Sequence, residues 1–391
     1  MTDPAPSTTP MAPGDGPLAA IAGLQARPWR WGGLATSVVG SHAHPSWFVA
    51  GLAAAERGEL GHDDLAEMLD DAVDTALRDQ EEAGIDVVTD GEMRRAGFFT
   101  AEFYRHLTGV RPLPSPRRLG AGGHDQQHRF EVTEPITAPG GLGVVAEYRY
   151  AATRTRRPLK ITLPGPYTLS GRLRTGPGEI YRDRVAASEA FLPILRAELV
   201  ALADAGAVLI QLDEPSAAIH PDAPADFAAL FNEAVAPIVG RVRLAAHLCF
   251  GNYLGRPLAK RTYRPILEAM LDFPVDELVL EFANREMAEV EVAAEIATTS
   301  RDVAAGVIDV KNYYVESATD VAERVERLIA AGVPPERLTL VPDCGFSQTA
   351  RWATRAKLRA LGAGRDLIAG RVAATTIPSA DPSATEGGAH R

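Results

Sequence analysis

The chain contains only two cysteines, Cys249 and Cys344, among its 391 residues. One residue separates His247 from Cys249, so on an extended segment both side chains leave the backbone on the same side. Glu281 lies near the end of the apolar run ELVLEF, and Cys344 follows the run LTLVPD. Two thiolates, an imidazole and a carboxylate form a donor set of borderline softness that suits Zn²⁺. These four side chains therefore predict a zinc site, with buried inert thiols as the alternative.

Other polar side chains also follow short apolar runs. In parallel strands of one barrel, such residues gather on the C-terminal rim, where active sites lie. Each of them alone could instead cap a helix or bond to the backbone. The residues in question are Gly40, Ser41, Asp90, Glu92, Asp213, Glu214, Asp309, Lys311 and Asp343.

The runs that position these residues are rich in Val, Ile and Leu, which is typical of buried parallel strands. They cover 36–40, 86–90, 159–163, 207–213, 243–248, 277–282, 306–310 and 338–343. Apolar residues at helical spacing lie between them, at 63–83, 181–205, 224–239, 263–271, 318–331 and 350–361. Eight strands with helical crossovers predict an α/β fold, a (β/α)₈ TIM barrel. The rival is an open doubly wound sheet, but no Gly-rich phosphate loop follows the first strand.

The connection after the second strand, 91–158, is too long for an ordinary loop. Within it, 128–136 and 142–152 flank the turn TAPGG and predict an antiparallel hairpin. This insertion could be a lid over the site or a contact in a homodimer. We expect a barrel domain over 34–375, between tails without fixed structure at 1–33 and 376–391.

Composition limits the possible partners. The net charge is −11, without long acidic or basic blocks, which disfavours nucleic acid and anionic membranes. No run of 18 apolar residues occurs, and the N-terminus lacks the pattern of a secretory signal. We therefore expect a cytoplasmic protein whose two cysteines form no disulfide framework.

In this order, the motifs resemble the C-terminal catalytic half of the cobalamin-independent methionine synthases, a family of barrels related to uroporphyrinogen decarboxylase. They are VVGS, VTDGE, LPGPYTL, IQLDEP, HLCFGNY, LEFANRE, IDVKN and PPERLTLVPDCGF. The layout is similar to the short, single-barrel members, which include archaeal-type methionine synthases and epoxyalkane:coenzyme M transferases. The resemblance implies a zinc-dependent methyltransferase that makes methionine from homocysteine, with a methylated folate such as 5-methyltetrahydropteroyltriglutamate as donor.

The resemblance also implies roles for single residues. Gly40 and Ser41 match the segment that meets the homocysteine carboxylate, whereas Glu92 and Asp213 match the carboxylates that receive its amino group. The family's zinc ligands are matched by His247, Cys249, Glu281 and Cys344.

Three positions depart from the family pattern. His42 replaces an aromatic residue, Arg172 lies near the place of a Trp that stacks on folate, and Lys311 replaces a His. Tyr167, or the pair Phe98 and Phe99, could supply an aromatic wall instead. The thiol-activating metal is therefore better supported than the folate.

The chemistry implied is alkylation of a metal-activated thiol. A methyl group on a tertiary nitrogen leaves poorly unless that nitrogen is protonated, and Asp309 or Lys311 is the candidate acid. A salt bridge with a neighbour is the alternative role for either residue. The acceptor or donor could also differ: another thiol such as coenzyme M, an epoxide, methylcobalamin or a small methylated metabolite. A barrel that binds zinc and a thiol without catalysis is the non-enzyme alternative.

Overall fold

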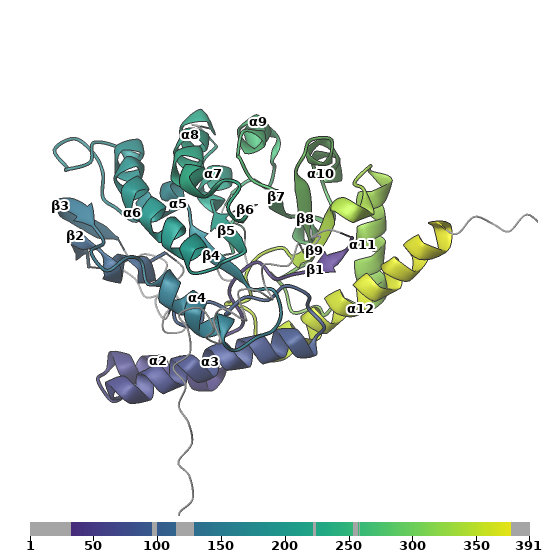
Figure 1. Cartoon of the computed structure of the whole chain (residues 1–391), viewed down its shortest axis with the longest axis horizontal. Helices are drawn as coiled ribbons and strands as arrows, with labels where there is room; N and C mark the ends of the chain where they lie inside the picture. Colours follow the sequence, from purple (N-terminus) through teal and green to yellow (C-terminus); the bar gives the residue numbers. More distant parts are fainter. Residues whose placement is uncertain are drawn as a thin grey trace, which may run out of the picture.

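Seven parallel strands form a curled sheet at the centre of the computed structural model (Figure 1). The structure describes residues 33–95, 100–114, 129–221, 224–252, 257 and 259–376. The order of the strands is β1-β9-β8-β7-β6-β5-β4. Their bounds are β1 Ala35–Thr36, β4 Lys160–Pro164, β5 Leu209–Asp213, β6 Arg243–Leu248, β7 Glu277–Glu281, β8 Asp302–Ile308 and β9 Leu338–Pro342.

The segment expected as the second strand, 86–90, lies between β1 and β4. Isolated parallel bridges join Ser37 to Val87 and Val88 to Leu159. The backbone N–H of Lys160 donates to the carbonyl of Val88 at 2.8 Å. This segment therefore occupies the eighth strand position of the ring, and the α/β barrel predicted from the sequence is confirmed.

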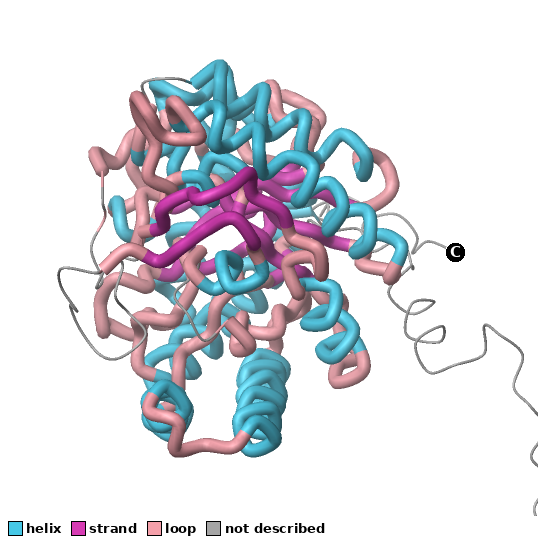
Figure 2. The backbone as a smooth tube through the Cα atoms, turned by 90° about the vertical axis from the view of Figure 1, so that its left-hand side faces the viewer, coloured by secondary structure: helices cyan, strands magenta, loops and turns pink. Residues whose placement is uncertain are grey.

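Helices cover the outside of the strands, which run through the interior in Figure 2. The longer helices are α2 Ser46–Glu56, α3 His62–Glu82, α4 Val144–Ala152, α6 Arg184–Asp204, α8 Pro224–Val235, α10 Val290–Ala297, α11 Ala318–Ala330 and α12 Arg351–Thr376. Short helices follow several strands: α5 Pro166–Ser170, α7 Pro215–Ile219 and α9 Leu267–Leu271, with 3₁₀ turns at Glu102–His106, Ala236–Ile238, Arg264–Ile266, Ala283–Arg285 and Pro335–Arg337.

Helix α11 illustrates why these segments are helical. Ser317 accepts from the backbone N–H of Asp320 at 3.1 Å, and the Asp320 carboxylate accepts from the N–H of Ser317 at 2.7 Å, which forms a capping box. Gly332 has a positive φ of 110° just beyond the helix, a conformation that glycine adopts without strain. The buried face consists of Val321, Ala322, Val325 and Leu328.

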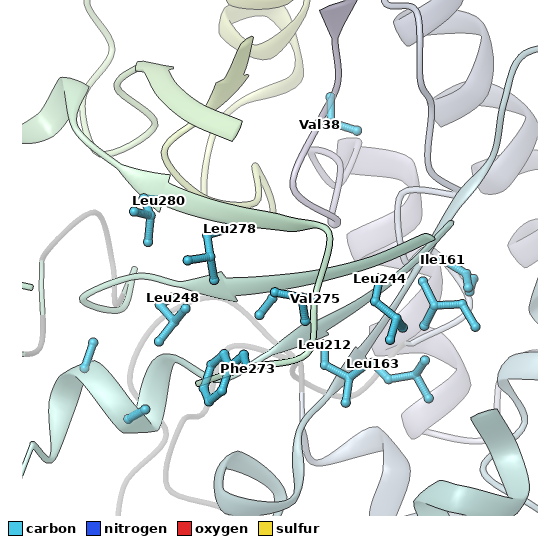
Figure 3. Close-up of a cluster of buried hydrophobic side chains, with 14 of the residues drawn as sticks. Val38, Ile161, Leu163, Leu212, Leu244, Leu248, Phe273, Val275, Leu278 and Leu280 are labelled. Atoms are coloured by element: carbon cyan, nitrogen blue, oxygen red, sulfur yellow. The ribbon is translucent and has the colours of Figure 1, made fainter. Parts of the chain in front are cut away.

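The apolar core has two layers. The larger lies between strands and helices, and Figure 3 shows part of it, including Leu163, Leu212 and Leu244 from neighbouring strands. A small separate cluster takes side chains from the opposite faces of the strands. Because side chains alternate across a strand, this second cluster fills the inside of the barrel. It consists of Val39, Val87, Leu209, Ala245, Val279, Ala304 and Val341.

The insertion differs from the predicted hairpin. Strand β3, Phe130–Thr137, pairs antiparallel with β2, Thr108–Pro112, and not with 142–152. The segment 144–152 is helix α4, because its buried residues Val144, Tyr148, Ala151 and Ala152 recur at helical spacing. The predicted partner strand was therefore wrong, although the insertion does contain an antiparallel pair.

The expected tails, 1–33 and 376–391, lie almost wholly outside the described residues. Within the described part of the chain, no helix combines the length and apolar character that crossing a bilayer requires. The cytoplasmic location stays a prediction.

Candidate metal centre and active site

The alternation that fills the barrel with small apolar residues also brings polar residues to its C-terminal end. On β6, Ala245 contributes to the interior cluster, so His247 and Cys249, two and four residues later, lie on the same side. On neighbouring β5, Asp213 pairs in register with His247. Strand geometry thus places the carboxylate next to the imidazole.

The structure brings together His247, Cys249 and Cys344. One ligand atom from each lies within 4.8 Å of the others, and the two sulfur atoms are 3.8 Å apart. Hydrogen bonding from the Cys249 thiol lowers the pKa of Cys344 well below its usual range. Such a pair, with a buried imidazole beside it, can hold a divalent metal once both thiols are deprotonated.

The orientation of His247 fits the same role. Its Nδ1 lies 3.3 Å from the carbonyl oxygen of Val279, whereas Nε2 is buried and forms no hydrogen bond of normal geometry among the described residues, although the Cys344 thiol is near enough to the ring to raise the pKa of His247 against the effect of burial. Metal-bound histidines commonly donate one ring N–H to a carbonyl and ligate through the other nitrogen. An unpaired buried nitrogen is costly without a ligand, so this ring fits a metal.

Glu281, the fourth expected ligand, is fully buried but is not among the residues whose ligand atoms all lie within 4.8 Å of one another; its carboxylate is paired with Lys311. Its Oε2 is 2.5 Å from Nζ of Lys311, and its Oε1 is buried with no partner in the described part of the chain. Burial raises the pKa of Glu281, and the ammonium of Lys311 opposes that rise. Conversely, burial lowers the pKa of Lys311, but the charges of Glu281 and Cys344 outweigh it and raise that pKa above its usual value.

Two aspartates hold the loops around Glu281. Asp343 accepts from the backbone N–H groups of Phe282 and Ala283, both at 2.9 Å, and from that of Asn284 at 2.6 Å. Asp309 accepts from Nδ2 of Asn284 at 3.1 Å. The loops after β7, β8 and β9 are thereby joined, and the sequence did not single out Asn284 for this role.

The Asp309 carboxylate has further partners on its own loop. It accepts from the backbone N–H of Lys311 at 2.7 Å and from the side chain of Asn312. Asp309 and Lys311 are therefore neighbours on one loop, with both side chains buried although the residues that follow are exposed. The backbone N–H of Lys311 contacts Asp309, whereas the side-chain ion pair of Lys311 is with Glu281.

Glu92 lies in a second buried cluster at the rim. Its Oε1 accepts from Thr162 Oγ1 at 2.6 Å and lies 3.2 Å from a guanidinium nitrogen of Arg95. Arg95 also bonds to Glu147 at 2.9 Å. Burial raises the pKa of Glu92, and Gly40 packs so closely that a β-carbon there would clash with Oε1.

Asp213 is oriented from inside the barrel. Nε2 of Gln211 donates to Asp213 Oδ1 at 2.7 Å, and Oε1 of Gln211 accepts from Lys160 Nζ at 2.8 Å. Because an ammonium can only donate, Lys160 fixes which end of the amide faces Asp213. Burial raises the pKa of Asp213 to about 7. Lys160 and Gln211 were not predicted as site residues, although a lysine inside the apolar run LKITL was a usable signal.

Ser41 adjoins the loop that carries Cys344. The carbonyl of Ser41 accepts from the backbone N–H of Phe346 at 2.8 Å. A β-carbon at Gly345 would clash with the Ser41 hydroxyl. The Gly40-Ser41 segment therefore lies between the Glu92 cluster and the metal-site loop.

The three departures from the family pattern have local partners, and that of Lys311 is Glu281. His42 is buried, with Nε2 3.0 Å from Asp79, and Nε of Arg172 donates to Thr100 at 2.8 Å. The guanidinium of Arg184 covers the ring of Tyr167 at 3.8 Å, so that ring face is already in contact. Phe98 and Phe99 lie outside the described residues.

Comparison with known proteins covers nearly the whole barrel. The model of the cobalamin-independent synthase catalytic domain matches residues 34–363. A methionine synthase of Thermococcus kodakarensis is 29% identical over 353 residues, which are 88% of this chain and 97% of that protein. One from Sulfurisphaera tokodaii is 30% identical over 338 residues, 86% and 92% of the two chains. The structure of a B12-independent methionine synthase from Shewanella sp. W3-18-1 in complex with selenomethionine is also similar, with a TM-score of 0.72 and 26% identity, covering 87% of this chain and 99% of that one.

Proposed function

Because the chain belongs to the cobalamin-independent methionine synthase family, we propose that it transfers a methyl group to the thiol of homocysteine and so forms methionine. The observation that carries this proposal is the cluster of His247, Cys249 and Cys344, whose ligand atoms lie within 4.8 Å of one another. Relatives that share most of the chain's length are methionine synthases, and one is described in complex with selenomethionine. Selenomethionine has an amino acid end and a selenium atom in place of sulfur. Such a ligand suits a rim where acidic side chains for an amino group lie near a metal site for sulfur.

The metal that this cluster would hold is zinc, with Oε1 of Glu281 as the fourth and exchangeable ligand. The fit rests on two buried atoms that have no partner among the described residues, His247 Nε2 and Glu281 Oε1, and on the softness of two thiolates. When bound, zinc would lower the pKa of the substrate thiol, so that a thiolate nucleophile exists at neutral pH.

The amino acid part of homocysteine would bind between Glu92, Asp213 and the Gly40-Ser41 segment. An ammonium group needs acceptors, and two buried carboxylates supply them as charge-assisted hydrogen bonds. The Ser41 hydroxyl and nearby backbone N–H groups would bind the carboxylate. These acidic residues favour an amino acid over a sulfonate acceptor such as coenzyme M, which would require unpaired cations there, because Arg95, the cation beside Glu92, is already paired with Glu92 and Glu147.

The methyl donor is the second substrate, and we assign 5-methyltetrahydrofolate or its polyglutamate. As the sulfur–carbon bond forms, the carbon–nitrogen bond breaks and the departing nitrogen takes a proton. That proton would come from Asp309 or Lys311, on the loop after β8. The contact between Arg184 and Tyr167 means that Tyr167 offers no free ring face on that side, so the pterin wall would have to come from elsewhere.

Turnover with isotopically labelled donors tests this function. Zinc-loaded enzyme and homocysteine are incubated with methyltetrahydrofolate, as mono- and polyglutamate, and methionine is measured. Labelled methionine from either folate supports the full assignment. If methionine forms only from methylcobalamin or a small methyl compound, folate is not the methyl donor. If no donor gives methionine, the chain is a barrel that binds a thiol without catalysis.

A further inference from the structure

Lys311 is the one ammonium that contacts a proposed metal ligand in the described part of the chain. Its Nζ lies 2.5 Å from Glu281 Oε2, and the two side chains are 1% and 0% exposed. The contact uses only one carboxylate oxygen, since Oε1 is buried without a partner among the described residues. The carboxylate can thus keep its ion pair through Oε2 and present Oε1 to a cation.

This ion pair is held by the loops on both sides. Glu281 ends β7 and Lys311 follows β8, the neighbouring strand. The N–H of Lys311 donates to Asp309 Oδ1 at 2.7 Å, and Asp309 also receives the side-chain amide of Asn284. Both ends of the pair are therefore fixed by backbone and side-chain hydrogen bonds rather than by the ion pair alone.

The charges explain what such a pair can do. Cys249, Cys344 and Glu281 would place three negative groups around a divalent cation, and Lys311 balances the excess negative charge. A substrate thiolate adds a fourth negative group, and the weakest ligand must yield to it. A carboxylate released at a fully buried position is costly unless a cation stays beside it.

We propose that Lys311, by holding Oε2 in an ion pair, weakens Glu281 as a metal ligand and stabilises its carboxylate after a substrate thiol takes its place. This inference rests on the proposed function. It makes Lys311 a positioning residue, which acts through Glu281 and touches neither substrate nor metal, and it leaves Asp309 as the candidate proton donor. If the salt bridge served only the fold, removing the charge of residue 311 would change neither the affinity for zinc nor the affinity for homocysteine.

The test compares Lys311→Met, Glu281→Gln and the double variant, with Lys311→Arg as a control that retains the charge. Zinc affinity is measured by competition with a chelator. Homocysteine affinity is measured on the Co²⁺-substituted protein from the sulfur-to-cobalt charge-transfer absorbance. Neither readout requires turnover, so the donor need not be known.

Without the ammonium, Glu281 becomes a stronger ligand and its release leaves an unpaired buried charge. Lys311→Met should therefore bind zinc about 10-fold tighter and homocysteine about 10-fold more weakly, the scale on which groups behind metal ligands act. Both changes should disappear when Lys311→Met is introduced into Glu281→Gln, whose neutral amide needs no counter-ion. Lys311→Arg should remain close to the wild type.

Unchanged affinities in Lys311→Met, or equal changes with and without Glu281→Gln, would overturn the inference. If Lys311→Met does not fold, Lys311→Gln makes the same comparison with a neutral hydrogen-bond donor. Failure of the proposed function looks different, because the wild-type Co²⁺ protein would then show no charge-transfer change on adding homocysteine.

Discussion

The sulfur atoms of Cys249 and Cys344 lie 3.8 Å apart, although the two residues are 95 positions apart in the chain. Cys249 follows β6 and Cys344 follows β9, so two strands, β7 and β8, lie between them in the sheet. Curling of the sheet brings these strand ends together over the barrel interior. Their proximity makes the metal site testable by removing either sulfur.

We expect Cys249→Ala and Cys344→Ala to lose zinc and activity while the barrel stays folded, because each removes one of the two thiolates. Zinc content per chain and the circular dichroism spectrum check this. His247→Ala should behave likewise, with His62→Ala, an exposed histidine, as the control that retains zinc. A zinc-free wild-type protein with full activity would contradict the assignment.

Asp213→Asn should weaken homocysteine more than 4-mercaptobutanoate, which is homocysteine without its amino group. Loss of a charged hydrogen-bond partner corresponds to about a 10-fold effect or more. Inhibition constants for both thiols measure the difference, and Glu92→Gln should show the same pattern. If both thiols lose affinity equally, the two carboxylates support the rim only.

Gly40→Ala should displace the carboxylate of Glu92, since a β-carbon there would clash with Oε1. A displacement of this carboxylate by up to about 1 Å should lower kcat/KM by about 10- to 100-fold. Gly140→Ala is the matched control, because no atom lies within 4 Å of its would-be β-carbon. A normal kcat/KM in Gly40→Ala would show that this close approach has no role in homocysteine binding.

A buried aspartate joins helices α3 and α12. Asp79 on α3 bonds to Arg351 on α12 at 2.6 Å and to His42 at 3.0 Å. Burial works to raise the pKa of Asp79, but the hydrogen bonds and charges of His42 and Arg351 outweigh it and lower that pKa below its usual range. A lowered folded-state pKa stabilises the protein above the unfolded-state value of about 3.9, and this stabilisation is lost as the pH falls below it.

Asp79→Asn should therefore lower the free energy of unfolding at pH 7 by about 1 to 2 kcal/mol, because the aspartate is buried but its partner Arg351 is 36% exposed and partly screened by solvent. The difference from wild type should shrink as the pH falls below about 4. Denaturant unfolding at several pH values measures it. Glu59→Gln, in the exposed pair with Arg57, should leave unfolding nearly unchanged, and a pH-independent loss in Asp79→Asn would contradict the electrostatic cause.

Much of the barrel follows from patterns that are local in sequence. The run predicted as a strand at 243–248 has the same first and last residues as β6, because continuous apolar residues identify a buried strand. The strand expected at 306–310 begins earlier in the structure, at Asp302. The prediction missed its first residues because DVAAG is buried but contains small residues with little strand preference. Helix α4 was missed for a related reason: a short segment with aromatic and β-branched residues satisfies both periodicities until its packing is known.

The sequence predicted which residues lie at the site, but not which of their side chains contact each other. Strand ends could be read from the runs, so His247 and Asp213 were expected on one rim, and they are paired in register. The ion pair of Lys311 with Glu281 depends on how two loops turn after their strands, and no local pattern encodes that. Lys160 and Gln211 were missed although a polar residue inside an apolar run was visible, because no sequence pattern says that the two side chains contact each other and Asp213.

Zinc K-edge X-ray absorption, with and without homocysteine, counts the sulfur neighbours of the metal. We expect two sulfur ligands, from Cys249 and Cys344, in the zinc-loaded protein, and a third after homocysteine is added. Zinc that keeps the same two sulfur neighbours at saturating homocysteine would contradict this expectation.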